Sequence, residues 1–195
     1  MSINIKAHRG RAAAVLAAVT CATVLAGVAP ARAATATYCG ITWGSLPKSA
    51  PELTASPIAG ARVGRHDCYD RLVIDLAGQP APGYFANYID GYFNQDTGER
   101  VPVAGGAILK VRVLAPGHDA NYQPTVPWKF GTHIVTPEQF SAGGFRTFRD
   151  LVYGATYEGE TDFVVGLRAR LPFRVLKLDG PGGGSRLIID VAHQW

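Results

Sequence analysis

Residues 70–76 of the chain, which read DRLVIDL, decide its fold. Aliphatic side chains stand at positions 72, 74 and 76, and charged side chains stand at Arg71 and Asp75. Residues 185–191, which read SRLIIDV, repeat this pattern nearly residue for residue. Because successive side chains of a strand point to opposite faces, both stretches predict a strand with a core face and a charged face.

The charged faces of the two predicted strands can match each other. If the strands are antiparallel neighbours in register, Arg71 lies opposite Asp190 and Asp75 lies opposite Arg186. Exposed cross-strand pairs of this kind contribute about 0.2–1 kcal/mol each. Two interpretations follow from the pattern. The charges either fix the register and keep a sheet face soluble, or they form a surface that takes part in ligand binding.

The rest of the chain is typical of an all-β protein. Short runs of β-branched and aromatic residues alternate with Gly, Pro, Asn and Asp clusters. Residues 34–65, rich in Pro, Ser and Ala, predict an extended arm that precedes one domain at 66–195. We expect a β-sandwich of two packed sheets with one long irregular loop at 115–144, inside which Thr136 and Pro137 are typical of a helix start.

The first 33 residues predict a signal peptide. Basic residues precede an apolar run at 12–28, and Ala31 and Ala33 are the small residues that signal peptidase requires. The run is short for a membrane-spanning helix, so we expect no stable membrane anchor after cleavage. This segment holds four of the 19 Lys and Arg and none of the 15 acidic residues, so the remaining chain has 15 of each. Its formal net charge of zero argues against nucleic acid as a partner.

The cysteines agree with export from the cell. Cys21 lies in the predicted signal peptide, which leaves Cys39 and Cys68. A remaining pair in an oxidising compartment predicts a disulfide. The alternative is a catalytic thiol at Cys68 beside His66.

Several stretches of this chain resemble a known family. They are HDCYDRLVIDL at 66–76, the Gly105-Gly106-Ala107 start of a strand, and PFRVLKLDG at 172–180 followed by Ser185-Arg186-Leu187. Their order resembles the AMIN-like domain of secreted actinobacterial proteins, which is related to the AMIN domain of cell-wall amidases and secretins. The resemblance covers residues 65–195. The 115–144 stretch and the cysteine pair are departures from it.

The resemblance implies a β-sandwich that acts as a localisation module and binds peptidoglycan or another envelope polymer. It therefore implies a secreted, cell-wall associated protein. A fold-level analogy of this kind is associational, so the site residues must be argued from the chain itself.

Motifs of known enzymes are not found in the sequence. It has no HExxH, GxSxG, P-loop or GxGxxG pattern. The four histidines after the predicted signal peptide have no partner at a metal-ligand spacing; they are His66, His118, His133 and His193. Glu158 and Glu160 flank Gly159 at a predicted hairpin turn, which favours solvated turn residues over an acid–base pair. We therefore predict no catalytic residue, no metal and no cofactor.

Aromatic residues are the remaining candidates for binding a glycan. Tyr84, Tyr88 and Tyr92 share one face of a predicted strand, and Phe85 and Ile89 share the other. The more apolar Phe and Ile face predicts core, which leaves the tyrosines as a candidate platform. Tyrosine is also ordinary core filler with its hydroxyl at the rim, so both interpretations stay open.

Two aromatic residues in the long loop are a second candidate. Tyr122 and Trp128 could contact a ligand, although Trp128 could equally anchor the loop to the domain.

Together these observations predict a non-catalytic envelope module that binds peptidoglycan or another wall glycan. The predicted ligand-binding residues are Arg71, Asp75, Tyr84, Tyr88, Arg186 and Asp190. Two alternatives are a protein–protein interaction module that uses the 115–144 loop and a wall hydrolase with an unrecognised site.

Overall fold

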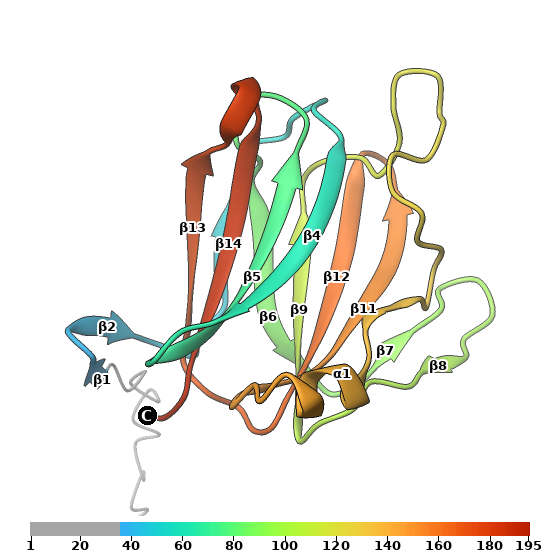
Figure 1. Cartoon of the computed structure of the whole chain (residues 1–195). Coiled ribbons are helices and arrows are strands. Elements are labelled where there is room, and N and C mark those ends of the chain that lie inside the picture. The colour runs from blue at the N-terminus through green and yellow to red at the C-terminus, as the bar shows by residue number, and fades with distance from the viewer. Residues whose placement is uncertain (1–35) are drawn as a thin grey trace, which may run out of the picture. The chain divides into compact units, whose positions relative to one another are not determined.

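A computed structural model describes residues 36–195 of the chain (Figure 1). The signal peptide predicted at 1–33 lies outside these residues. The strands, all paired antiparallel, are β1 (Ala36–Tyr38), β2 (Ile41–Trp43), β3 (Lys48–Ala50), β4 (Ile58–Arg65), β5 (Tyr69–Leu76), β6 (Tyr84–Ile89), β7 (Tyr92–Phe93), β8 (Arg100–Val101), β9 (Ala107–Val113), β10 (His133–Val135), β11 (Phe148–Tyr157), β12 (Glu160–Leu167), β13 (Phe173–Asp179) and β14 (Ser185–Ala192). The helical elements are α1 (Pro137–Ala142) and the 3-10 turn η1 (Pro181–Gly183).

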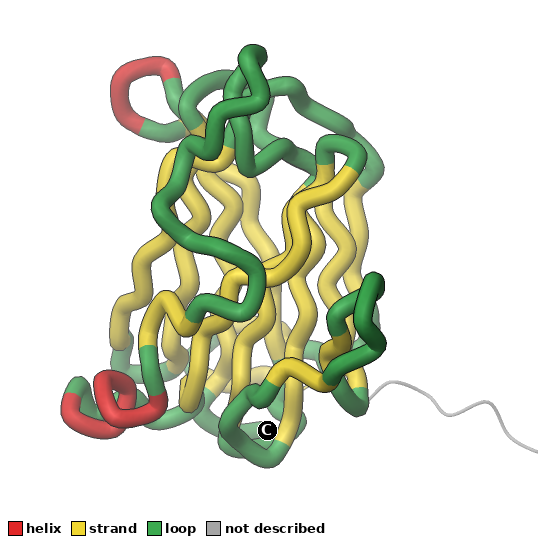
Figure 2. The backbone as a smooth tube through the Cα atoms, turned by 90° about the vertical axis from the view of Figure 1, so that its right-hand side faces the viewer, coloured by secondary structure: helices red, strands yellow, loops and turns green. Residues whose placement is uncertain are grey.

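Two sheets form the sandwich that the sequence predicts. One has six strands in the order β10-β11-β12-β9-β6-β3, and the other has four in the order β13-β14-β5-β4. In Figure 1 the four-stranded sheet lies in front of β6 and β9. Figure 2, turned by 90°, shows the strands running between two ends that carry the loops. The all-β sandwich is thus confirmed.

Strands β5 and β14 are central neighbours in the four-stranded sheet. Their register places Arg71 opposite Asp190 and Asp75 opposite Arg186, as the sequence predicts. Leu72 and Leu187 are both fully buried in one hydrophobic cluster, together with apolar side chains from the six-stranded sheet. The two-residue alternation therefore fixes which face of each strand enters the core.

A second, smaller cluster covers the outer face of the six-stranded sheet. The β7–β8 hairpin brings Tyr92 and Val101 onto Ile108, Val152 and Val164. Because this hairpin shields part of the outer face, both faces of the sheet carry buried apolar residues there, and strict alternation is lost.

Residues 36–65, the described part of the predicted extended arm, differ from that prediction. Strand β3 pairs with β6 in one sheet, and strand β4 pairs with β5 along most of its length in the other. Glycines at positions 60 and 64 lower the strand propensity of β4, which is why its pattern is weak in the sequence. The segment is therefore part of the sandwich.

A disulfide joins Cys39 to Cys68, as expected. It ties the β1–β2 hairpin to the turn between β4 and β5. Trp43 at the end of β2 is buried, and its Nε1 donates a hydrogen bond to the carbonyl oxygen of Tyr38 at 2.9 Å.

The long stretch at 115–144 is held to the sandwich at several points. Thr136 caps α1 in a capping box with Gln139, and Phe140 of that helix is buried. Trp128 packs against Tyr153 and Phe163 with ring centroids 5.7 and 6.5 Å away. Trp128 therefore anchors the loop to the domain.

Candidate binding surface

The outer face of the four-stranded sheet carries an ion-pair network. Arg71 donates to both carboxylate oxygens of Asp190 at 2.6 and 2.8 Å, and Nε of Arg174 donates to the same carboxylate at 2.9 Å. Asp190 is fully buried beneath these two guanidinium groups. The hydrogen bonds to Asp190 raise the pKa of Arg71. The arrangement holds two positive charges against one negative charge.

The opposite end of the same face has a different pairing. Arg62 on β4 makes two hydrogen bonds to Asp75, at 3.0 and 2.9 Å. Arg186 lies directly across from Asp75 on β14, but within residues 36–195 its buried Nε has no hydrogen-bond partner. Asp75 is thus engaged by the strand on its other side, and the guanidinium of Arg186 has no carboxylate partner in this part of the chain.

We call this surface the arginine face and define it by Arg62, Arg71, Arg174 and Arg186 on the outer side of the four-stranded sheet. Its four guanidinium groups and the two carboxylates of Asp75 and Asp190 leave a formal surplus of two positive charges.

An apolar row crosses the arginine face between its charged ends. Leu176, Ile188 and Val73 stand side by side in the strand register, and the neighbouring Leu178 is 46% exposed. Long arginine stems can cover such a row while their charged ends stay in water. Because Val73 and Ile188 are buried, the exposed apolar surface beside the positive charges lies on β13, at Leu178.

Aromatic side chains border the face near the disulfide. The guanidinium of Arg174 lies 5.2 Å from the ring centroid of Trp43 and 5.3 Å from that of Tyr69. The guanidinium of Arg71 also lies over Tyr69, at 5.1 Å. These contacts hold the two guanidinium groups in defined positions.

The structure does not place Tyr84 and Tyr88 beside these charges. Both residues lie on β6 of the six-stranded sheet and pack toward the hydrophobic cluster between the sheets. Tyr88 donates to the carbonyl of Leu171 at 2.6 Å and accepts from its amide at 3.0 Å. Burial raises the pKa of Tyr88 to about 12. The structure thus supports the core interpretation for Tyr84 and Tyr88, whereas Tyr92 lies on β7 in the smaller cluster on the outer face of the six-stranded sheet.

Phe85, which the sequence places in the core, is instead 47% exposed. The β7–β8 hairpin covers the end of β6 near Ile89 and does not cover Phe85. The prediction that the Phe85 face of this strand enters the core, made from its apolar character, is therefore wrong for Phe85.

Four contributors to the arginine face were missed from the sequence: Arg62, Arg174, Trp43 and Tyr69. Arg62 and Trp43 fall in the segment predicted as an arm. Arg174 meets Asp190 only because β13 pairs with β14, a pairing that the sequence pattern does not specify. The alternation of β13 could have placed Arg174 on the outer face once that pairing was known.

The described part of the chain gives no sign of a metal centre or a membrane span. Between residues 36 and 195 no group of three or more His, Cys, Asp and Glu side chains could hold a metal ion. In the same range no helix is long and apolar enough to cross a membrane.

The two packed antiparallel sheets and the arginine face define an all-β sandwich domain with a charged outer sheet surface. Residues 56–193 match the family model of the AMIN-like domain, so the chain belongs to the AMIN-like domain family. Domains of this family are extracytoplasmic, envelope-related and generally non-catalytic binding modules. No curated protein and no solved structure matches the chain.

Proposed function

We propose that this protein is a non-catalytic module that binds peptidoglycan at the cell envelope through the arginine face. The surplus of positive charge on a solvent-facing sheet is the observation that carries the proposal. Peptidoglycan bears carboxylate groups on its peptide stems, and arginine pairs with carboxylates through charge-assisted, often bidentate hydrogen bonds.

Each predicted site residue on this face has its own part in the proposal. Arg186 is half-buried and makes no ion pair in the described chain, so in this proposal its guanidinium pairs with a wall carboxylate. Arg71 and Asp190 hold Arg174 in place, and Asp75 holds Arg62. Tyr84 and Tyr88 support the sheet packing from the other side of the core and have no contact role in the proposal.

Sedimentation with purified insoluble cell wall tests the proposal. The native protein is expected to sediment with the wall, and Arg186→Gln is expected to weaken retention about tenfold, because one charge-assisted hydrogen bond is lost. Arg186 makes no ion pair within residues 36–195, so its replacement leaves the network around Asp190 intact.

Arg100→Gln is the matched control, since Arg100 is an exposed arginine on β8, outside the arginine face. Retention of this variant should equal that of the native protein. A native protein that stays in the supernatant, or an Arg186→Gln variant retained as well as the native protein, would refute the proposal. Capture of an envelope protein without affinity for bare wall would favour the protein–protein alternative.

A further inference from the structure

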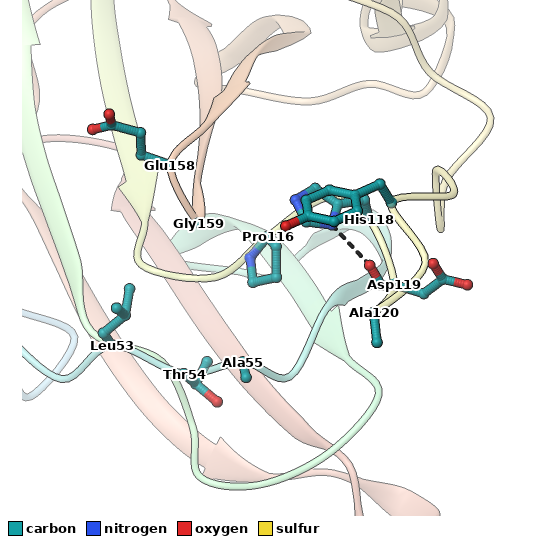
Figure 3. A pocket seen from close by; sticks show the side chains of 10 residues that line it. Leu53, Thr54, Ala55, Pro116, His118, Asp119, Ala120, Glu158 and Gly159 are labelled. Carbon is teal, nitrogen blue, oxygen red and sulfur yellow. Dashed lines mark hydrogen bonds between the residues drawn. The ribbon is translucent and has the colours of Figure 1, made fainter.

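A cleft of about 580 Å³ opens among loops that join strands of the sandwich (Figure 3). Three chain segments line it: residues 53–55 before β4, residues 116–122 after β9, and the tip of the β11–β12 hairpin at 158–159. In Figure 3 Leu53 and Glu158 lie on one side and His118 lies on the other, with Pro116 between them. We call this site the loop cleft.

Tyr122 is the most exposed aromatic side chain of the loop cleft, with 80% of its surface open to solvent. Its ring stacks on that of His118 with centroids 5.0 Å apart and planes inclined by 30°. Stacking on the imidazole supports one face of the phenol ring. The opposite face is therefore available as a flat platform at the mouth of the cleft.

The loop that carries Tyr122 is held by its own hydrogen bonds. Oδ1 of Asp119 accepts from the amides of Asn121 and Gln123 at 2.8 and 2.9 Å, and its carbonyl accepts from the amide of Tyr122 at 3.0 Å. Nδ1 of His118 lies 2.9 Å from the same carbonyl oxygen. These bonds fix the tip of the loop, so Tyr122 is presented by an ordered turn.

The backbone of Tyr122 is strained, with a φ of +59°. A bulky residue rarely adopts this left-handed conformation, which favours glycine. Strain kept at one exposed aromatic residue is typical of a functional position. The turn would form more easily with glycine, yet the chain places a tyrosine there.

The rest of the loop cleft combines apolar surface with acidic groups. Leu53 is 65% exposed and lies with Ala55 and Pro116 along the apolar part of the lining. The carboxylates of Glu158 and Asp119 line the same cleft and make it negatively charged. An anionic ligand would be repelled here, in contrast to the arginine face.

We propose that the loop cleft binds the ring of an uncharged N-acetylated hexosamine. The flat face of the sugar stacks on Tyr122, its acetamido methyl group contacts the apolar lining at Leu53 and Pro116, and a hydroxyl donates to the carboxylate of Glu158. Sugar binding at the loop cleft depends on the proposed function in one respect, the source of the sugar, which would be the glycan strand of the wall. The two surfaces then recognise the neutral and the anionic parts of one polymer.

Titration of the whole protein with soluble tetra-N-acetylchitotetraose, followed by saturation-transfer NMR and calorimetry, tests the loop cleft. Tyr122→Ala is expected to weaken binding about tenfold, the loss of one stacking platform. Tyr122→Gly should lose binding equally, and it should fold at least as well because glycine tolerates the positive φ. Phe93→Ala, which removes a half-exposed aromatic residue on β7, should bind as the native protein does.

Cellotetraose, which lacks the acetamido groups, should bind several-fold more weakly than the N-acetylated sugar. Equal affinity for the two sugars would refute the acetamido contact. No binding by the native protein, or equal loss in Tyr122→Ala and Phe93→Ala, would refute the loop cleft. Wall retention without oligosaccharide binding would leave the proposed function standing, and oligosaccharide binding without wall retention would overturn the proposed function alone.

Discussion

Tyr88 closes the space between the sheets at the point where the chain enters β13. Its hydroxyl meets both backbone polar groups of Leu171, and the guanidinium of Arg170 lies 5.0 Å from its ring centroid. A buried backbone amide or carbonyl without a hydrogen-bond partner would cost about 1–3 kcal/mol. The Tyr88 hydroxyl avoids this cost for both backbone groups of Leu171.

Tyr88→Phe is expected to lower the free energy of unfolding by about 1–3 kcal/mol at pH 8, because the amide and carbonyl of Leu171 lose their partner. The folded-state pKa of about 12 lies above the ordinary value of 10.0, so the neutral phenol is favoured in the folded state. The stability from this group is fully present below pH 10 and is lost as the pH rises toward 12.

The difference in stability between native protein and Tyr88→Phe should therefore narrow between pH 10 and 12. Urea unfolding at several pH values measures it. A difference that stays constant through this range would contradict the assigned cause of the raised pKa.

At the scale of elements, β5 and β14 were predictable and β4 was not. The alternation at 70–76 and 185–191 gave faces, register and a shared core, because a shift of one residue would turn every aliphatic side chain outward. The ion pairs could be predicted only in part. Asp75 faces Arg186 as predicted but bonds to Arg62, since β4 supplies a competing guanidinium from its other side.

The β1–β2 hairpin is the element that depends most on a covalent link. Among residues 36–195 its three-residue strands pair with each other and with no further strand, and the disulfide at Cys39 fastens them to the turn at Cys68. Trp43, at the end of this hairpin, borders the arginine face through its contact with Arg174.

Replacing both cysteines by serine is expected to lower the free energy of unfolding by about 3–4 kcal/mol, since the bond closes a loop across a sequence separation of 29 residues. Trp43 should also become accessible to iodide quenching as the hairpin loosens. Reduction of the native protein should reproduce both effects. Unchanged stability together with unchanged quenching would show that the hairpin is held by packing alone.

At the scale of the whole molecule, the sandwich brings charges from four strands onto one face and three loop segments to one end. Sequence reasoning predicted Tyr122 only as one of two loop aromatics, because exposure depends on how the loop folds. Trp128 in the same loop turned inward, since Tyr153 and Phe163 offer it a packing site. The cleft itself could not be predicted, because residues 53–55 and 158–159 approach the loop only in the folded chain.

The two proposed contacts differ in their response to salt, and this difference separates them in one assay. Charge contacts of the arginine face weaken when the screening length falls from about 10 Å at 0.1 M salt to about 3 Å at 1 M, whereas stacking on Tyr122 does not depend on charge. Wall retention of Tyr122→Ala should therefore drop steeply as NaCl rises. At low salt, Arg186→Gln should be retained more weakly than the native protein. Between 0.1 and 1 M NaCl its retention should change less than that of Tyr122→Ala.

Because both contacts would lie on one polymer, the double variant should lose more retention than either single variant, as expected for two linked sites. Sedimentation across a salt series measures all four proteins. Identical salt curves for the two single variants would show that the arginine face and the loop cleft do not contribute separate interactions.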